Sequence, residues 1–483
     1  MTKTELKPQE VFHFFEEICQ IPRPSKKEEL IRAYLRKFAT ERKLTFKEDH
    51  IGNILISKPA TAGYEDRQTV ILQSHIDMVC EKNNDTVHNF DKDPIQTYVD
   101  GEWLKAKGTT LGADNGIGVA TELAILDTKN IEHGPIECLF TVDEETGLTG
   151  AFELQAGFME GTILLNLDSE DEGELFIGCA GGAGTTATFP LKQEVAPANY
   201  TFLKVTVKGL TGGHSGDDIN KDRANANKLL NRVLMKIAKQ SDLKLATIDG
   251  GNLHNAIPRE AHAIFGIPTA DKAAIETLIP TLEADFRNEY AVTEPNLAVI
   301  VEAAQATSVM EKESMMRFLH AIYAVHNGVL AMSQDMPGLV ETSSNLASIK
   351  MKEEGIVVVT SQRSSILSSR KNMSQMIRSA FILGGATVTT GDGYPGWKPN
   401  TNSDILKVTV ESYIRLFGVE PKVKAIHAGL ECGLFLEKYP HLDMVSFGPT
   451  LRGVHSPDER MLIPTVEKFW LHLLDVLKHI PQK

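Results

Sequence analysis

Several features are missing from the 483-residue sequence, and each absence narrows the class of protein. No apolar run is long enough to cross a bilayer, and residues 1–20 lack the apolar core of a signal peptide, so we expect no membrane partner. The five cysteines are scattered without CxxC spacing, which indicates neither a disulfide framework nor a thiolate zinc site. A reducing cytoplasm is therefore the expected compartment.

Positive charge is also in short supply. Fifty Lys and Arg residues stand against 64 Asp and Glu residues, and the net charge of -14 argues against nucleic acid as the main partner. An excess of acid is compatible with cation binding, although it more often serves only solubility. The proportions of hydrophobic residues (42%) and charged residues (24%) are ordinary for a globular protein, and the length predicts about two to three domains.

The order of strand and helix patterns predicts an α/β fold with a second domain inserted into the first. Residues 1–187 alternate apolar strands with helical patterns, as a mixed sheet covered by helices does. Between 188 and 390 alternating strands and long helices are typical of an α+β unit. Strand and helix segments of the first kind return after residue 391. We therefore expect one domain formed by 1–187 and 391–483, with 188–390 inserted.

The strand-like run TVILQSH ends in a His-x-Asp motif formed by His75 and Asp77. On an extended strand these two side chains project to the same side. The carboxylate of Asp77 could then reach one ring nitrogen of His75 and leave the other for a metal ion. A hydrogen-bonded polar pair at a strand end is the alternative, and the motif alone does not separate the two readings.

More charged residues follow the other predicted strands. Asp114 precedes a predicted helix, where it could equally cap that helix. Three carboxylates, at 143–145, crowd together after IECLFTV, and a bound cation would relieve their repulsion. Asp168 follows ILLNL, and His455 lies in a Gly/Pro-containing loop after DMVSFGP. Ligands of open α/β sheets bind outside the carboxyl ends of the strands, so we expect these side chains to converge with His75.

These motifs carry a resemblance to a known family. The His-x-Asp motif together with ADNG, DEETG, LDSED and GVHSPDE resembles the metal signature of the carnosinase-type dizinc metallopeptidases. With GLTGGHSG, NAIPRE, YPGWKPN and HAGLECG, the chain is most similar to the aminoacyl-histidine dipeptidase (Xaa-His dipeptidase) branch, over essentially its whole length. The resemblance implies a metallopeptidase catalytic domain with a mixed sheet covered by helices, and an inserted α+β lid domain through which two copies dimerise.

The resemblance also implies roles for the residues at the strand ends. The resemblance implies that His75 and Asp168 hold one divalent ion and that Glu145 and His455 hold a second. Asp114 would bridge the two ions. Glu144 would be the general base, and Asp77 would orient His75. Imidazole and carboxylate ligands suit zinc, with manganese or cobalt as substitutes, and two such ions can together polarise a carbonyl and activate water. On an extended segment Glu144 and Glu145 would point to opposite sides, unless a turn intervenes.

In the inserted domain the resemblance implies groups that bind the substrate. His214 in GLTGGHSG would help to stabilise the oxyanion, often from the partner subunit, whereas the simpler reading is a histidine in a Gly-rich turn. Asn255 and Arg370 would receive the C-terminal carboxylate of a dipeptide, which an arginine can bind bidentately. Arg363 is near enough in the sequence to be confused with Arg370.

Three further residues are candidates for the pocket. Glu431 in HAGLECG is the first, and we include it among the substrate-binding residues. Tyr394 and Trp397 in GYPGWKPN are the others, although these aromatic side chains could equally serve packing.

The predicted function is hydrolysis of dipeptides by a cytoplasmic, homodimeric dizinc metallopeptidase. The substrates would be Xaa-His dipeptides including β-alanyl-histidine, cleaved by metal-activated water with Glu144 as the base. The same chemistry on a tripeptide, a Xaa-Gly dipeptide or an N-acyl amino acid is the near alternative. A non-catalytic binding protein on the same fold is the remote one, and the complete set of ligand and base residues argues against it.

Overall fold

The computed structural model describes residues 6–483, and the chain divides into two compact units. Unit 1 comprises the residues up to Gly178 together with Pro399–Ala425 and Leu430–Lys483, and unit 2 comprises Cys179–Lys398 and Ile426–Gly429. Both ends of the chain therefore contribute to unit 1, and the boundaries proposed from the sequence at 188 and 390 fall inside the range of unit 2. Among the described residues, no helix is long and apolar enough to cross a membrane.

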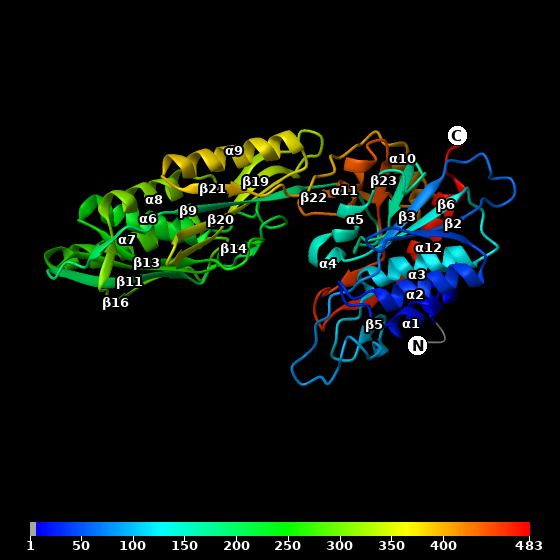
Figure 1. Cartoon of the computed structure of the whole chain (residues 1–483), viewed down its shortest axis with the longest axis horizontal. Helices are drawn as coiled ribbons and strands as arrows, with labels where there is room; N and C mark the ends of the chain where they lie inside the picture. The colour runs from blue at the N-terminus through cyan, green and yellow to red at the C-terminus, as the bar shows by residue number, and fades with distance from the viewer. Residues whose placement is uncertain (1–5) are drawn as a thin grey trace. The chain divides into compact units, whose positions relative to one another are not determined.

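Unit 1 is built on an eight-stranded mixed sheet in the order β1-β2-β6-β3-β7-β23-β8-β22 (Figure 1). Its strands are β1 Thr45–Glu48, β2 Ile54–Lys58, β3 Val70–His75, β6 Ile136–Thr141, β7 Ile163–Asn166, β8 Glu174–Cys179, β22 Lys422–Ile426 and β23 Asp443–Ser446. The central strands β6, β3, β7 and β23 run parallel, so their carboxyl ends meet at one edge of the sheet. The predicted α/β class with a mixed sheet is confirmed.

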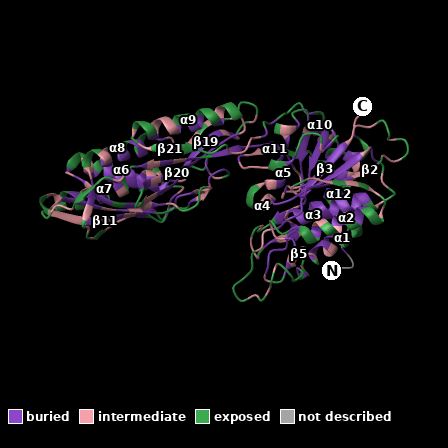
Figure 2. Cartoon of the chain, viewed as in Figure 1, coloured by how far each residue is buried: buried purple, intermediate pink, exposed green. Residues whose placement is uncertain are grey.

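The central strands of unit 1 form because their sequences are apolar runs that the sheet buries. Every residue of β3, β6 and β7 is buried (Figure 2). The polar residues Gln73 and Ser74 of β3 are buried with the rest, and buried polar groups require hydrogen-bond partners. Their partners therefore show what surrounds the strand that carries His75.

The helices of unit 1 pack on this sheet and on one another. They are α1 Gln9–Cys19, α2 Glu29–Glu41, α3 Ala113–Asp127, α4 Glu144–Gly147, α5 Thr149–Glu153, α10 Asp404–Phe417, α11 Glu431–Lys438 and α12 Ile463–Lys478. Helix α3 packs closely against β3, where Ser74 Oγ donates a hydrogen bond to Glu122 of α3. Gly118 permits this approach, because a Cβ atom there would lie 2.9 Å from the Cβ of Ser74. Asp114 is thereby held near the end of β3.

A smaller sheet completes unit 1, with the order β24-β25-β5-β4. Its strands are β4 Thr97–Asp100, β5 Trp103–Ala106, β24 Leu451–Arg452 and β25 Arg460–Leu462. The loop between β24 and β25 carries His455, whose backbone has a left-handed conformation with φ of 61°.

Unit 2 contains an antiparallel sheet in the order β16-β11-β15-β13-β19-β20-β9-β21, with β18 paired to β19. Its strands are β9 Gly181–Phe189, β11 Tyr200–Lys208, β13 Lys244–Gly250, β15 Ala261–Pro268, β16 Ala298–Ala303, β18 Gly328–Met332, β19 Val340–Lys352, β20 Gly355–Ser364 and β21 Thr387–Thr390. Two short ribbons pair β10 Gln193–Val195 with β17 Ser308–Met310, and β12 Gly213–His214 with β14 Ala256–Ile257.

The helices of unit 2 pack against this sheet and enclose one hydrophobic core (Figure 1). They are α6 Ala226–Gln240, α7 Lys272–Glu289, α8 Lys312–Ala324 and α9 Leu367–Leu383, with a short 3-10 turn at Thr269–Asp271. The helical pattern in the sequence starts near residue 220, but α6 begins only at Ala226. The side chain of Asn225 sets this start, since it accepts hydrogen bonds from the backbone amides of Asn227 and Lys228.

Candidate metal centre and substrate-binding residues

The charged residues singled out in the sequence gather at the carboxyl ends of the central strands of unit 1. His75 is the last residue of β3, Glu145 lies in α4 directly after β6, and Asp168 follows β7. Asp114 belongs to the first turn of α3, and His455 to the loop between β24 and β25. The parallel pairing of β3 with β6 and β7 places the first three at one edge of the sheet.

The carboxylate of Asp114 is shared by two groups of side chains. Its Oδ1 lies 3.1 Å from Nε2 of His75, and its Oδ2 lies 3.2 Å from Nε2 of His455. Asp168 Oδ1 stands 3.5 Å from Nε2 of His75, and Glu145 Oε2 stands 3.0 Å from Nε2 of His455. The structure thus brings the five predicted ligands together as two pairs with Asp114 between them.

The electrostatics of this cluster call for positive charge. Hydrogen bonds to Asp114 and Glu145 raise the pKa of His455 to about 11, so the protein atoms alone hold its imidazole protonated. Burial would lower the pKa of His75, but the carboxylates of Asp168 and Asp114 raise it well above its usual value. Burial raises the pKa of the Asp168 carboxyl to about 6. Cations that bind here must displace protons from both histidines.

The donor set fits divalent cations. Two imidazoles and three carboxylates are ligands that zinc accepts, and atoms of His75, Asp114 and Glu145 lie within 4.8 Å of one another. Glu145 Oε1 is buried and has no hydrogen-bond partner among residues 6–483, as a carboxylate oxygen reserved for a cation would be. Two divalent ions bring about four positive charges, and the three carboxylates balance about three of them once both histidines are neutral.

Asp77 connects two segments of this centre. Its Oδ1 lies 3.3 Å from Nδ1 of His75, on the ring edge opposite Asp114. The same carboxylate accepts hydrogen bonds from the backbone amides of Glu144 and Glu145, and from the hydroxyl of Ser25. One buried side chain therefore fixes both the ring of His75 and the start of α4.

The three adjacent acids after β6 have separate environments. The carboxylate of Asp143 accepts hydrogen bonds from the hydroxyls of Thr146 and Thr149, so it stabilises the turn. Glu144 and Glu145 lie in the helical turn α4, and the expected alternation along an extended strand does not apply to them. Burial raises the pKa of the Glu144 carboxyl well above its usual value; His75 opposes this increase, and the nearby carboxylates add to it. A carboxyl group in this state has the affinity for a proton that a general base needs.

A second cluster of acids, Glu28, Asp77 and Asp143, lies beside the first but has a different character. Glu28 Oε1 accepts hydrogen bonds from the backbone amides of Lys26 and Asp143. Because protein donors occupy the carboxylates of all three residues, this cluster organises the segments that carry the ligands.

Comparison with known proteins identifies the family. Residues 71–479 match the model of peptidase family M20/M25/M40. The chain belongs to this family. It is 46% identical over 481 residues to the cytosol non-specific dipeptidase of Escherichia coli K12, and the match covers 99% of each chain. The crystal structure of aminoacylhistidine dipeptidase from Vibrio alginolyticus is also 46% identical, with a TM-score of 0.94 and coverage of 100% of this chain and 99% of that one.

These relatives confirm the resemblance to the aminoacyl-histidine dipeptidase branch and the prediction of a peptidase. A tripeptidase from Staphylococcus aureus has the same fold, with a TM-score of 0.58, 17% identity, and coverage of 98% of this chain and 99% of that one. At that identity the similarity concerns the fold alone.

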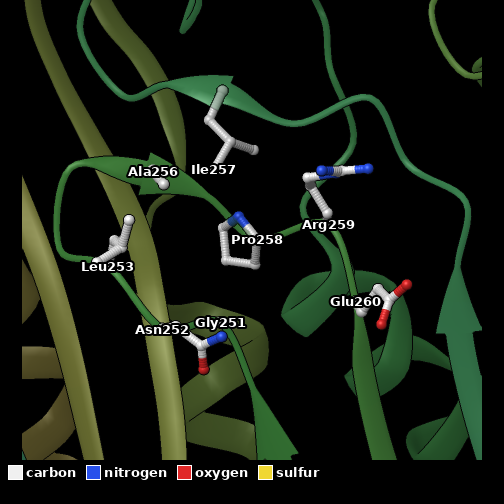
Figure 3. Close-up of a pocket in the computed structure, with 8 residues that line it drawn as sticks. All are labelled: Gly251, Asn252, Leu253, Ala256, Ile257, Pro258, Arg259 and Glu260. Carbon is white, nitrogen blue, oxygen red and sulfur yellow. The ribbon is translucent and has the colours of Figure 1, made fainter. Parts of the chain in front are cut away.

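In unit 2 of this M20/M25/M40 peptidase, His214 lies on a β-ribbon and Asn255 directly precedes the second strand of that ribbon. His214 of β12 pairs with Ala256 of β14, and the backbone amide of Ser215 donates to the carbonyl of Asn255 at 2.8 Å. Neighbours of Asn255 on both sides, residues 251–253 and 256–260, line a cavity of about 330 Å³ (Figure 3). The pairing of β12 with β14 thus brings the segments that carry His214 and Asn255 side by side.

The two candidate arginines of unit 2 have different surroundings. Arg363 Nη2 lies 3.4 Å from Nε2 of His214, and its Nη1 donates to the hydroxyl of Tyr394 at 3.2 Å. Arg370 is buried to the same extent, with 5% of its surface exposed against 6% for Arg363, but it donates to three backbone carbonyls, those of Gly182, Tyr394 and Asp392. The observed hydrogen bonds therefore favour Arg363 over Arg370 as the group available to a substrate.

The pocket candidates Trp397 and Glu431 differ in their location and their contacts. Trp397 is 4% exposed, and its backbone pairs with that of Cys179, so it belongs to the packing of unit 2. Glu431, the first residue of α11, is buried in unit 1, and its Oε2 accepts hydrogen bonds from Gln73 and Thr141. Burial raises the pKa of its carboxyl to about 7.

Several residues that hold the centre together were missed by the sequence analysis. Glu459 accepts hydrogen bonds from the backbone amides of residues 111–114, and so ties the start of α3 to the segment that carries His455. Arg23 donates to the carbonyls of Ile76, Asp77 and Gly112, and Asn115 Nδ2 donates to Asp168. Glu459 lies inside the quoted motif GVHSPDE and Asn115 inside ADNG, but the sequence did not reveal that these side chains are buried.

Proposed function

We propose that this peptidase hydrolyses dipeptides, including Xaa-His dipeptides such as β-alanyl-histidine, with two divalent metal ions. The observation that carries the proposal is the carboxylate of Asp114, shared between His75 with Asp168 on one side and His455 with Glu145 on the other. Both 46% identical relatives are named as dipeptidases, and the Vibrio alginolyticus relative is named as an aminoacylhistidine dipeptidase.

The residues present would hold the ions as two pairs and a bridge. Asp114 would contact both, and zinc suits the donor set best, with manganese or cobalt as substitutes. When bound, such ions polarise the scissile carbonyl and acidify water. Asp77 would keep His75 in one ring orientation by its contact with Nδ1.

The proton transfers fall to Glu144. Its carboxylate would take a proton from the attacking water and later deliver it to the nitrogen of the leaving amine. Two features support this role: Glu144 is adjacent to the ligand Glu145, and burial gives it a raised pKa. Attack by water requires no covalent intermediate with the protein.

We assign the recognition of the substrate's far end to unit 2. His214 would stabilise the oxyanion, and Asn255 with Arg363 would receive the C-terminal carboxylate. The proposal prefers Arg363 because its guanidinium adjoins His214, whereas that of Arg370 is occupied by backbone carbonyls. We further propose that the protein forms a homodimer, as the family resemblance implies. A cytoplasmic location is supported by the Escherichia coli relative, which is named as a cytosol dipeptidase.

The proposal predicts that metal removal abolishes hydrolysis and that metal return restores it. Protein depleted of metal by a chelator should lose activity on β-alanyl-histidine. Addition of zinc, manganese or cobalt should restore the activity at about two bound ions per chain. A panel of Xaa-His, Xaa-Gly, tripeptide and N-acyl amino acid substrates would be assayed with the same preparations. Full activity of the metal-depleted protein would contradict the proposal, and exclusive cleavage of tripeptides or N-acyl amino acids would redefine the substrate.

A second prediction concerns Arg363. Wild-type enzyme should prefer β-alanyl-histidine to its C-terminal amide, because the amide lacks the charge that a guanidinium binds. Arg363→Ala should reduce kcat/KM for the free dipeptide by about ten- to a hundredfold and largely remove this preference. Arg370→Ala is the matched comparison, and we expect it to lower the melting temperature while it leaves the preference intact. The opposite pattern, with the preference lost only in Arg370→Ala, would return the role to Arg370.

A further inference from the structure

A row of buried polar side chains crosses the main sheet of unit 1 beneath the ligand residues. Gln73, Asn166 and Ser446 occupy directly paired positions on β3, β7 and β23. Ser446 Oγ donates to Asn166 Oδ1, and Asn166 Nδ2 donates to Gln73 Oε1 at 2.6 Å. Gln73 Nε2 in turn donates to Oε2 of Glu431 at 2.6 Å. The row therefore ends on a carboxylate.

This carboxylate lies on the face of the sheet that carries His75. Side chains alternate along a strand, so Gln73 projects to the same face as His75, two positions further on. Thr141 is the residue of β6 that pairs with His75, and its hydroxyl also donates to Glu431 Oε2, at 3.0 Å. Glu431 is thus held by the two strands whose ends flank the candidate metal centre.

The two oxygens of the Glu431 carboxylate differ in their hydrogen bonds to the described residues. Oε2 accepts both hydrogen bonds, while Oε1 is buried without a hydrogen-bond partner in the described part of the chain. The whole side chain is 1% exposed. A buried carboxylate oxygen without a donor is costly, and the nearby carboxylates of Asp168 and Glu144 increase that cost. A cation with N–H donors would remove both penalties.

We propose that Oε1 of Glu431 receives the protonated amino group at the N-terminus of the substrate. This inference rests on the proposed dipeptidase function and adds to it a specificity for peptides with a free amine. A single carbon separates an α-amino nitrogen from the scissile carbonyl, and a β-alanyl residue adds one methylene. An amine site must therefore lie beside the groups that act on that carbonyl. The donors to Glu431 meet this requirement, because Thr141 is the cross-strand partner of His75 and Gln73 lies two residues before it on the same strand.

The test compares β-alanyl-histidine with propionyl-histidine, which has the same amide but no amino group. Wild-type enzyme should cleave propionyl-histidine about ten- to a hundredfold less efficiently in kcat/KM, the range expected for a charged hydrogen bond. Glu431→Gln should reduce kcat/KM for β-alanyl-histidine to the same extent and leave that for propionyl-histidine near the wild-type value. The glutamine carbonyl can still accept from Gln73 and Thr141, so the row persists. Glu437→Gln, an exposed acid on the same helix, is the control.

A shortened side chain gives an independent readout. Glu431→Asp withdraws the carboxylate by one methylene, and the longer β-alanyl arm should reach it better than an α-amino group does. The ratio of kcat/KM for β-alanyl-histidine over alanyl-histidine should therefore rise relative to wild type. A change in the preference between substrates of different length would not arise if Glu431 had a purely structural role.

The outcomes separate this inference from the function on which it rests. Equal wild-type rates on β-alanyl-histidine and propionyl-histidine would overturn the amine site while the dipeptidase proposal stands. An equal loss on both substrates in Glu431→Gln, or a loss of bound metal, would assign Glu431 to the structure of the centre instead. Absence of hydrolysis of every dipeptide by metal-loaded wild type would overturn both.

Discussion

Replacing Glu144 by glutamine should abolish most hydrolysis while the metal content stays at the wild-type level. General acid-base catalysis contributes about 10²- to 10⁴-fold, and we expect kcat on β-alanyl-histidine to fall by that factor. Glutamine keeps the size and the hydrogen-bonding capacity of the side chain, but it cannot take the proton of the attacking water. The backbone amide of Glu144, which donates to Asp77, is unaffected by the change.

The measurement pairs turnover with elemental analysis of the same protein sample. Glu153→Gln is the matched control, because this exposed acid lies in α5 close to Glu144 in the sequence and contacts His50 rather than the ligand cluster. Near-normal turnover in Glu144→Gln would remove Glu144 from the proposed role. A loss of metal together with activity would make it a ligand.

The convergence of the strand-end residues could be predicted from the sequence because it depends on local patterns and one general rule. His75, Asp168 and the acids after β6 each follow an apolar run of strand length, and the ends of parallel strands share an edge. No knowledge of distant contacts was needed to place them together. The grouping into two pairs that share Asp114 came from the family resemblance, since strand patterns do not carry distances.

Contacts between segments far apart in the sequence could not be predicted in this way. Glu459 binds amides 345 to 348 positions earlier in the chain, and Glu431 meets Gln73 across 358 positions. Nothing in the local pattern of either motif indicates which backbone or side chain lies opposite. The sequence also does not distinguish an Asp or Glu residue that is buried and hydrogen-bonded from one that is exposed to solvent.

Arg363 and Arg370 show the same limit at short range. Both occur in one segment of unit 2, and an arginine of either position satisfies the requirement for a bidentate donor. The difference lies in what already surrounds each guanidinium: three backbone carbonyls at Arg370, and the side chains of His214 and Tyr394 at Arg363. Which groups surround each guanidinium depends on the folded structure, so the sequence alone does not reveal it.

The turn after β6 is the exception under which Glu144 and Glu145 were not expected to point to opposite sides. The expectation that Glu144 and Glu145 alternate requires an extended backbone, but Asp143 adopts a left-handed conformation with φ of 50° and starts the helical turn α4. Hydrogen bonds from Thr146 and Thr149 to Asp143 stabilise this turn. The DEETG motif contains both partners of the first of these bonds, so the turn could have been predicted from it.

Asp114→Ala should remove both metal ions, whereas Asp77→Ala should only weaken their binding. Asp114 contributes one carboxylate oxygen to each group of ligands, so its loss affects His75 and His455 together. Asp77 contacts the far ring nitrogen of His75, and residues of this kind typically affect metal affinity by about ten- to a hundredfold. Titration of metal-free protein with zinc in competition with a chelator would measure the two affinities.

The structure provides a way to separate this effect from damage to the helix. The backbone amides at the start of α3, including that of Asp114, are held by Glu459, and an alanine at 114 leaves those hydrogen bonds intact. Asp127→Ala at the other end of α3 removes a partly exposed salt bridge to Arg42 and should leave metal binding unchanged. If Asp114→Ala retained two ions with wild-type affinity, the shared carboxylate would not be a bridge. Loss of a single ion would instead assign Asp114 to the one group that failed, with the other group complete without it.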